Sequence, residues 1–121
     1  MLVDDDVDFV TVNKTLLEKY SYEVIVAYNG RDCLEGVRRK RPDIIILDMM
    51  MDTIGEGFEV SRELRNSERT KHIPLVMLTS VNTALPIRFK PDRTWLPVDM
   101  LLEKPVEPEL LLEVVQNMTP G

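Results

Sequence analysis

The sequence predicts an α/β domain in which helices cover both faces of a parallel β-sheet. Short apolar runs alternate with amphipathic stretches along the chain, which is typical of repeated βαβ units. The run Ile44–Leu47 is apolar without interruption, as expected of a strand buried on both faces. The length of 121 residues fits one core, so residues 1–121 are predicted to form a single domain.

The first half of the chain is predicted to hold three strands and two helices. The strands are the apolar runs at residues 2–3, 22–27 and 44–47. Asp6 or Asp8 is expected to cap the first helix, and Asn29 the second, which ends before Pro42. The residues expected to face inward from these helices are Phe9, Val12, Leu16, Leu17, Tyr20, Cys33, Leu34 and Val37.

The second half is predicted to alternate in the same way, with one exception. Strands are expected at 75–78 and 98–102, and helices at 58–65 and from Pro108 onward. Their inward residues are Val60, Leu64, Leu111, Leu112 and Val115. The segment 81–97 contains three prolines, which forbid one uninterrupted helix. We therefore expect the helix between the fourth and fifth strands to be short or broken.

Bulk properties exclude several classes of protein. The net charge of −6 argues against direct binding to nucleic acid or to an anionic membrane. No apolar run is long enough to span a bilayer, and the N-terminus does not resemble a signal peptide. Cys33 is the only cysteine and is expected to be a buried thiol, which fits a reducing compartment. These observations together indicate a cytoplasmic protein.

Polar side chains with complementary chemistry follow four of the predicted strands. Asp4 and Asp5 follow the first strand, Asp48 the third, Thr79 the fourth and Lys104 the fifth. In an open parallel sheet, ligands bind beyond the carboxyl ends of the strands. The three acids, the hydroxyl group and the ammonium group are therefore expected to converge at one edge of the sheet.

This set of side chains predicts a site for Mg²⁺-dependent phosphoryl transfer. Crowded carboxylates repel, and a divalent cation with oxygen ligands removes that cost. Asp48 would be the nucleophile, while Lys104 and Thr79 would contact the phosphoryl oxygens. Each residue also has an ordinary interpretation, as a helix cap, a strand-end hydroxyl or a solvated charge. Four such coincidences at four separate strand ends are improbable.

The chain resembles the receiver domains of two-component response regulators over essentially its whole length. The motifs that carry the resemblance are Leu2-Val3-Asp4-Asp5-Asp6, the run 43–51, Leu78-Thr79-Ser80 and Glu103-Lys104-Pro105. The resemblance implies a flavodoxin-like three-layer sandwich, with a five-stranded parallel sheet of order 2-1-3-4-5. It also implies a cis peptide bond before Pro105.

The same resemblance implies a role for each site residue. Asp48 would accept a phosphoryl group from the phosphohistidine of a histidine kinase or phosphotransfer protein, and Thr79 and Lys104 would contact that group. Asp5 would bind Mg²⁺ directly, Asp4 would assist through water, and the backbone carbonyl of Met50 would complete the protein ligands. The domain would then not be an enzyme in the usual sense, since it would catalyse only its own phosphorylation and dephosphorylation.

Two departures from the family pattern concern the output of the signal. Leu101 stands where receivers carry an aromatic switch residue, and a leucine is expected to stay packed. The segment 81–97 is long and contains Phe89, Trp95 and several cations. We therefore expect an unknown output partner to contact residues 81–97, although these aromatic residues could equally pack the loop onto the sheet.

Two alternative functions remain open at this point. A haloacid-dehalogenase-like phosphatase also uses a strand-end aspartate with Mg²⁺. Its motif ends in threonine or valine where this chain has Asp8, and its covalent phosphate would sit on Asp4. A pseudo-receiver that binds partners without phosphorylation is the other alternative. Such domains usually lose an acid or the lysine, and this chain keeps all of them.

Overall fold

The computed structural model describes residues 1–51, 55–80 and 98–120. The elements in these ranges are β1 (Leu2–Val3), α1 (Val7–Lys19), β2 (Val26–Ala27), α2 (Gly30–Arg39), β3 (Ile45–Asp48), α3 (Glu56–Asn66), β4 (Leu75–Ser80), β5 (Met100–Lys104) and α4 (Pro108–Met118). The predicted broken helix and the predicted output surface both fall in residues 81–97, outside the described residues.

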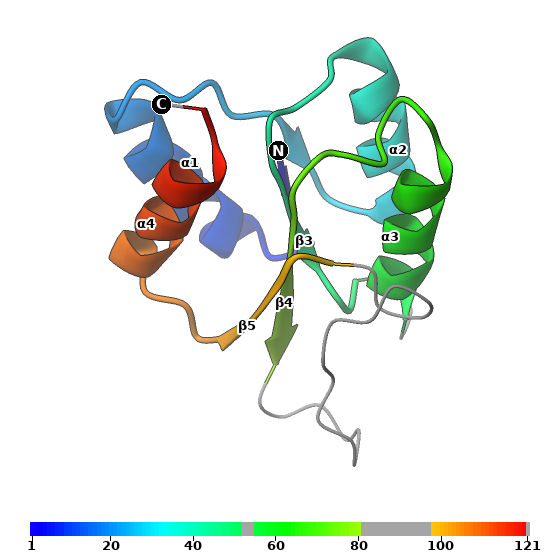
Figure 1. The fold of residues 1–121 in the computed structure, drawn as a ribbon. Helices are drawn as coiled ribbons and strands as arrows, with labels where there is room; N and C mark the ends of the chain where they lie inside the picture. The colour runs from blue at the N-terminus through cyan, green and yellow to red at the C-terminus, as the bar shows by residue number, and fades with distance from the viewer. Residues whose placement is uncertain (52–54, 81–97, 121) are drawn as a thin grey trace.

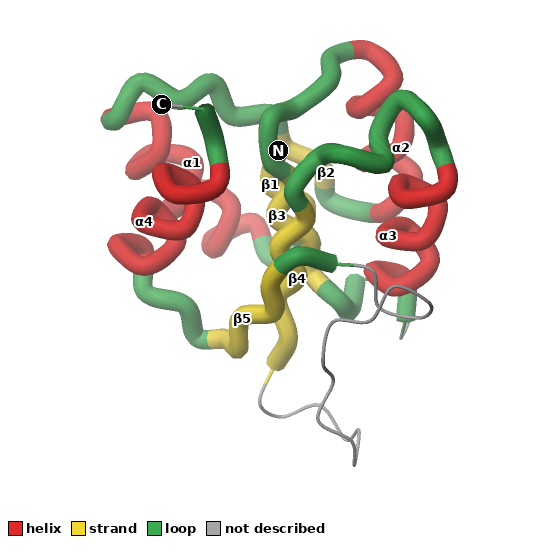
Figure 2. The backbone as a smooth tube through the Cα atoms, viewed as in Figure 1, coloured by secondary structure: helices red, strands yellow, loops and turns green. Residues whose placement is uncertain are grey.

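The strands form one parallel sheet in the order β2-β1-β3-β4-β5. Helices α1 and α4 cover one face of this sheet, and α2 and α3 cover the other (Figure 1). Figure 2 shows the strands as a central layer between the two pairs of helices. The predicted fold class, a three-layer α/β/α sandwich with strand order 2-1-3-4-5, is therefore confirmed.

Two apolar clusters, one on each face of the sheet, hold the layers together. On β3, Ile45 and Leu47 pack with the cluster that includes Cys33 of α2, while Ile46 packs with the opposite cluster. This alternation follows from the period of two residues along a strand, and it explains why the run is apolar throughout. Cys33 is fully buried as predicted, and burial raises the pKa of its thiol to about 12.

The predicted helix caps agree with the structure. The Asp6 carboxylate accepts a hydrogen bond from the backbone N–H of Phe9 at 3.2 Å, which decides between the two aspartates proposed for α1. The Asn29 side chain accepts a hydrogen bond from the N–H of Asp32 at 2.8 Å. Each cap satisfies a backbone donor that the first helical turn leaves free.

Three local predictions were wrong. Val12 and Tyr20 were expected to face inward, but they are 54% and 51% exposed. The spacing of apolar residues in α1 is compatible with more than one face, and the buried face is the one that carries Val10 and Leu17. Strand β2 spans only two residues rather than 22–27. Strand β5 begins two residues later than predicted and extends to Lys104.

Candidate functional site

The predicted site residues lie at the carboxyl edge of the sheet, which is at the lower end of β4 in Figure 1. Asp4 follows β1 directly, and Asp48 is the last residue of β3. In the register of the sheet Asp48 is opposite Leu78, so Thr79 is one residue further along β4. Lys104 ends β5. Parallel pairing thus brings Asp4, Asp48 and Lys104 from three strand ends together, and Thr79 lies on the neighbouring part of β4.

Three of these residues form an acidic cluster. Asp4, Asp5 and Asp48 each offer a carboxylate oxygen, and these oxygens lie within 4.8 Å of one another. Asp4 and Asp48 are buried, whereas Asp5 is exposed. A set of oxygen donors with one side open to water fits a hard cation such as Mg²⁺, which keeps several water ligands.

Lys104 places its ammonium group between the two buried carboxylates. Its Nζ donates a hydrogen bond to Asp4 at 2.7 Å and lies 3.6 Å from a carboxylate oxygen of Asp48. The same Nζ lies 4.8 Å from the centre of the Phe9 ring, within range of a cation–π interaction. The lysine therefore offsets part of the negative charge of the cluster.

The environment of the site shifts the pKa values of Asp48 and Lys104. Burial, followed by the charge of Asp4, raises the pKa of Asp48 to about 7, against the opposing effects of Lys104 and of the Met50 N–H. Burial by itself lowers the pKa of Lys104. The hydrogen bond to Asp4 and the nearby carboxylates outweigh that effect, so the pKa of Lys104 is raised overall. At neutral pH the site thus holds a charged lysine beside an acid that is readily protonated.

Backbone contacts orient the two buried carboxylates. The N–H of Asp6 donates to Asp4 Oδ1 at 2.9 Å, and the N–H of Met50 lies 3.4 Å from Asp48 Oδ1. The start of α3 presses against this loop, since a Cβ on Gly57 would lie 2.5 Å from the backbone oxygen of Asp48. Only glycine permits this close approach of α3 to the end of β3.

The remaining predicted residues are placed consistently with their proposed roles, which stay predictions. Thr79 is buried at the end of β4, and Met50 lies two residues beyond Asp48. The Lys104–Pro105 peptide bond is cis, as predicted. Leu101 packs against the core, as expected of a leucine at that position.

The roles of two residues in this site were not predicted. Phe9 was expected only as an apolar residue at helical spacing, although its ring lies beside Lys104. No role was predicted for Gly57, although its lack of a side chain sets the position of α3. The position of Phe9 one turn after the acidic run was the only available signal for the first.

The fold and the site define a class of protein: an α/β domain with an acidic, lysine-bearing cluster suited to phosphoryl transfer at the carboxyl edge of its sheet. The profile of the response regulator receiver domain matches residues 1–116. The chain therefore belongs to the receiver domain family of two-component response regulators. The phosphatase and pseudo-receiver alternatives are accordingly not favoured.

Individual relatives agree with this assignment. The chain is 27% identical over 124 residues to protein PilH of Pseudomonas aeruginosa, covering 100% of this chain and 97% of that protein. It is 38% identical over 82 residues to the transcriptional regulatory protein AfsQ1 of Streptomyces coelicolor, covering 68% of this chain and 35% of that protein. The chain thus spans nearly all of one relative and about a third of the other.

Solved structures show the same architecture. The chemotaxis response regulator CheY4 of Vibrio cholerae superimposes with a TM-score of 0.79 at 29% identity, covering 97% of this chain and 94% of that one. Among the residues that the structure describes, no helix combines the length and the apolar character needed to cross a bilayer.

Proposed function

We propose that this receiver domain accepts a phosphoryl group onto Asp48 from the phosphohistidine of a histidine kinase or a phosphotransfer protein. The observation that supports the proposal most directly is the position of Asp48. Its carboxylate ends the central strand, with other acids within 4.8 Å and the Lys104 ammonium group at 3.6 Å. Thr79 lies one residue beyond the register partner of Asp48.

The transfer is a nucleophilic displacement at phosphorus. A carboxylate oxygen of Asp48 forms the new P–O bond, and the P–N bond of the phosphohistidine breaks with its electron pair left on the imidazole nitrogen. Lys104 balances negative charge on the phosphoryl oxygens, and the Thr79 hydroxyl donates a hydrogen bond to one of them.

Asp5, Asp48 and the carbonyl of Met50 are the proposed ligands of Mg²⁺, with Asp4 assisting through water. When bound, Mg²⁺ supplies positive charge that offsets repulsion among the carboxylates and the incoming phosphoryl oxygens. The acidic cluster supports this assignment, because its donors are all oxygen atoms. Lys104, whose Nζ lies 3.6 Å from a carboxylate oxygen of Asp48, would contact the oxygens of a phosphoryl group carried by that residue.

In this proposal the domain acts as a signalling phosphoacceptor rather than as an enzyme with a separate substrate. It catalyses only its own phosphorylation and dephosphorylation. A cytoplasmic location is proposed with it, since the lone buried Cys33 fits a reducing compartment. Contact of an output partner with residues 81–97 remains a prediction. Direct binding to nucleic acid or membrane is not expected at a net charge of −6.

Intact-protein mass spectrometry after incubation with acetyl phosphate and Mg²⁺ tests the proposal. The wild-type chain should gain the mass of one phosphoryl group, and Asp48→Asn should gain none. Asp4→Asn distinguishes receiver chemistry from phosphatase chemistry: if the modification were lost from Asp4→Asn but kept in Asp48→Asn, Asp4 would be the nucleophile. Exposed Asp8→Asn, on the first turn of α1, is the matched control and should be phosphorylated normally.

A further inference from the structure

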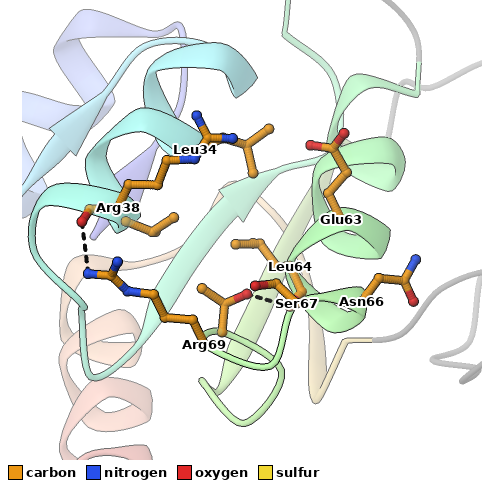
Figure 3. A pocket seen from close by; sticks show the side chains of 9 residues that line it. Leu34, Arg38, Glu63, Leu64, Asn66, Ser67 and Arg69 are labelled. Carbon is orange, nitrogen blue, oxygen red and sulfur yellow. Dashed lines mark hydrogen bonds between the residues drawn. The ribbon is translucent and has the colours of Figure 1, made fainter.

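A second concave site lies at the opposite edge of the sheet from Asp48. It is a cavity of ≈ 310 Å³ between the C-terminal ends of α2 and α3 and the loop that follows α3 (Figure 3). In parallel βαβ units these helix ends lie beside the amino ends of the strands, whereas Asp48 lies at the carboxyl ends. The cavity therefore shares no residue with the proposed phosphorylation site.

The cavity has an apolar floor and a charged rim. Leu34 and Val37 of α2 and Leu64 of α3 supply the apolar surface, and Arg38, Arg69 and Glu63 supply the charged groups. In Figure 3, Arg38 lies on α2, the side chain of Arg69 reaches toward it from the loop after α3, and Glu63 lies across from them on α3. The apolar floor can accommodate an aliphatic side chain of a ligand. The charged rim selects the charge of the ligand groups on either side of that side chain.

Hydrogen bonds hold the walls of the cavity in place. Arg69 Nη2 donates to the backbone oxygen of Arg38 at 2.8 Å, which links the loop after α3 to the end of α2. The buried Thr70 hydroxyl donates to the backbone oxygen of Leu64 at 2.6 Å. Because both bonds end on backbone atoms, the cavity is part of the folded framework and does not depend on surface side chains alone.

The rim carries positive charge that the described part of the chain does not neutralise. The neighbouring cations Lys40, Arg65 and Lys71 form ion pairs with Glu23, Asp99 and Glu68. Arg38 and Arg69 of the rim are exposed, as are Arg39 and Arg41 near Arg38 in the sequence, and none of the four forms an ion pair within the described residues. A cluster of uncompensated arginines on a chain of net charge −6 is complementary to an acidic ligand.

We propose that this cavity binds an acidic segment of a partner protein that carries one aliphatic side chain. The aliphatic side chain packs on Leu34, Val37 and Leu64, and carboxylates on either side of it pair with Arg38 and Arg69. The apolar floor favours a peptide over nucleic acid, because phosphates offer nothing to bury in the cavity. Arginine at such a rim also matches carboxylate geometry.

The position of the cavity gives this interaction a distinct property. Because the cavity and Asp48 lie at opposite edges of the sheet, the proposed binding does not require phosphorylation. The partner would recognise the receiver in both states, as an anchoring or scaffolding contact. Asp48→Asn should therefore bind the acidic segment as well as the wild type does, which separates this proposal from the proposed phosphoryl transfer.

Fluorescence anisotropy with a labelled peptide of three glutamates, a leucine and three glutamates tests the proposal. The wild-type chain should bind it. Arg38→Glu and Arg69→Glu should each weaken binding about tenfold, and replacing the peptide leucine by glycine should weaken it by a similar factor. Lys19→Glu makes the same charge change at an exposed site on α1 and should leave binding unchanged. Amide NMR shifts should change at Val37, Leu64 and Thr70.

Circular dichroism would show whether each variant folds. If Arg69→Glu does not fold, the binding measured for Arg38→Glu alone tests the proposal. The proposal is overturned if the peptide does not bind, or if both arginine variants bind it as the wild type does. Equal binding of a single-stranded oligonucleotide or of anionic vesicles would overturn the assignment to an acidic protein segment. Self-association that Arg38→Glu abolishes would show that a second copy of the chain is the occupant.

Discussion

Replacing Asp48 by asparagine should stabilise the metal-free protein at pH 8. Folding raises the pKa of Asp48 from 3.8 to about 7, chiefly through burial and then through the charge of Asp4. Between these two values the folded state keeps a proton that the unfolded chain has lost. The free energy of unfolding therefore falls as pH rises through this window, and the loss is complete above about pH 7.

The size of the effect follows from the two pKa values. At about 1.36 kcal/mol for each pH unit between them, ionised Asp48 would cost about 4 kcal/mol at most. The effect of Lys104 is already contained in the pKa of about 7, and water at the open edge of the site reduces the cost further. We expect Asp48→Asn to be more stable than the wild type by about 2 kcal/mol at pH 8.

Urea unfolding in the presence of a chelator, at pH 5 and at pH 8, measures this difference. The wild type should lose about 1 kcal/mol more than Asp48→Asn between the two pH values, because only the part of the window above pH 5 is crossed. Asp8→Asn controls for the loss of a negative charge, because Asp8 is exposed on α1, and its pH dependence should follow the wild type. If Asp48→Asn kept the full pH dependence of the wild type, the proposed destabilisation of the folded state by ionised Asp48 would be refuted.

Three further outcomes follow from the same site. Mg²⁺ at a hundredfold excess over its dissociation constant should raise the free energy of unfolding by about 2.7 kcal/mol, and an unchanged melting temperature would contradict the acidic cluster as a metal site. Lys104→Ala leaves Asp4 buried without its partner, so urea unfolding should show a loss of about 2 kcal/mol without metal and a smaller loss with Mg²⁺. Gly57→Ala should cost about 1–3 kcal/mol and slow labelling by acetyl phosphate, because the new Cβ meets backbone atoms. Gly36→Ala meets only the flexible end of Met1 and should cost much less.

The sequence predicted the fold well because its strongest signals are local. A short uninterrupted apolar run of β-branched residues is typical of a strand buried on both faces, and β3 is such a strand. Strand ends were less certain, because backbone pairing with a neighbour decides where a strand stops. Tyr22 and Val24 pack against the core without joining β2. In α1, apolar Val12 lies on the exposed side, since packing selects one of several possible faces.

The site was predictable for a different reason. In a parallel sheet all carboxyl ends meet, so residue types at strand ends suffice to indicate which side chains converge. Residues that act through shape or ring geometry give no such signal. The role of Gly57 depends on the path of α3 past Asp48, and the role of Phe9 depends on the position of a side chain almost one hundred residues away.

The hydrogen bond from Lys104 to Asp4 joins residues 100 positions apart in the sequence. During synthesis on the ribosome, the acids of β1 and β3 are made long before the lysine that offsets their charge. The acidic cluster therefore gains the ammonium group that offsets part of its charge only when β5, the edge strand, docks against β4. Truncation anywhere before Lys104 would leave Asp4 and Asp48 without this counter-charge, so a correctly assembled site reports that the chain has folded through its last strand.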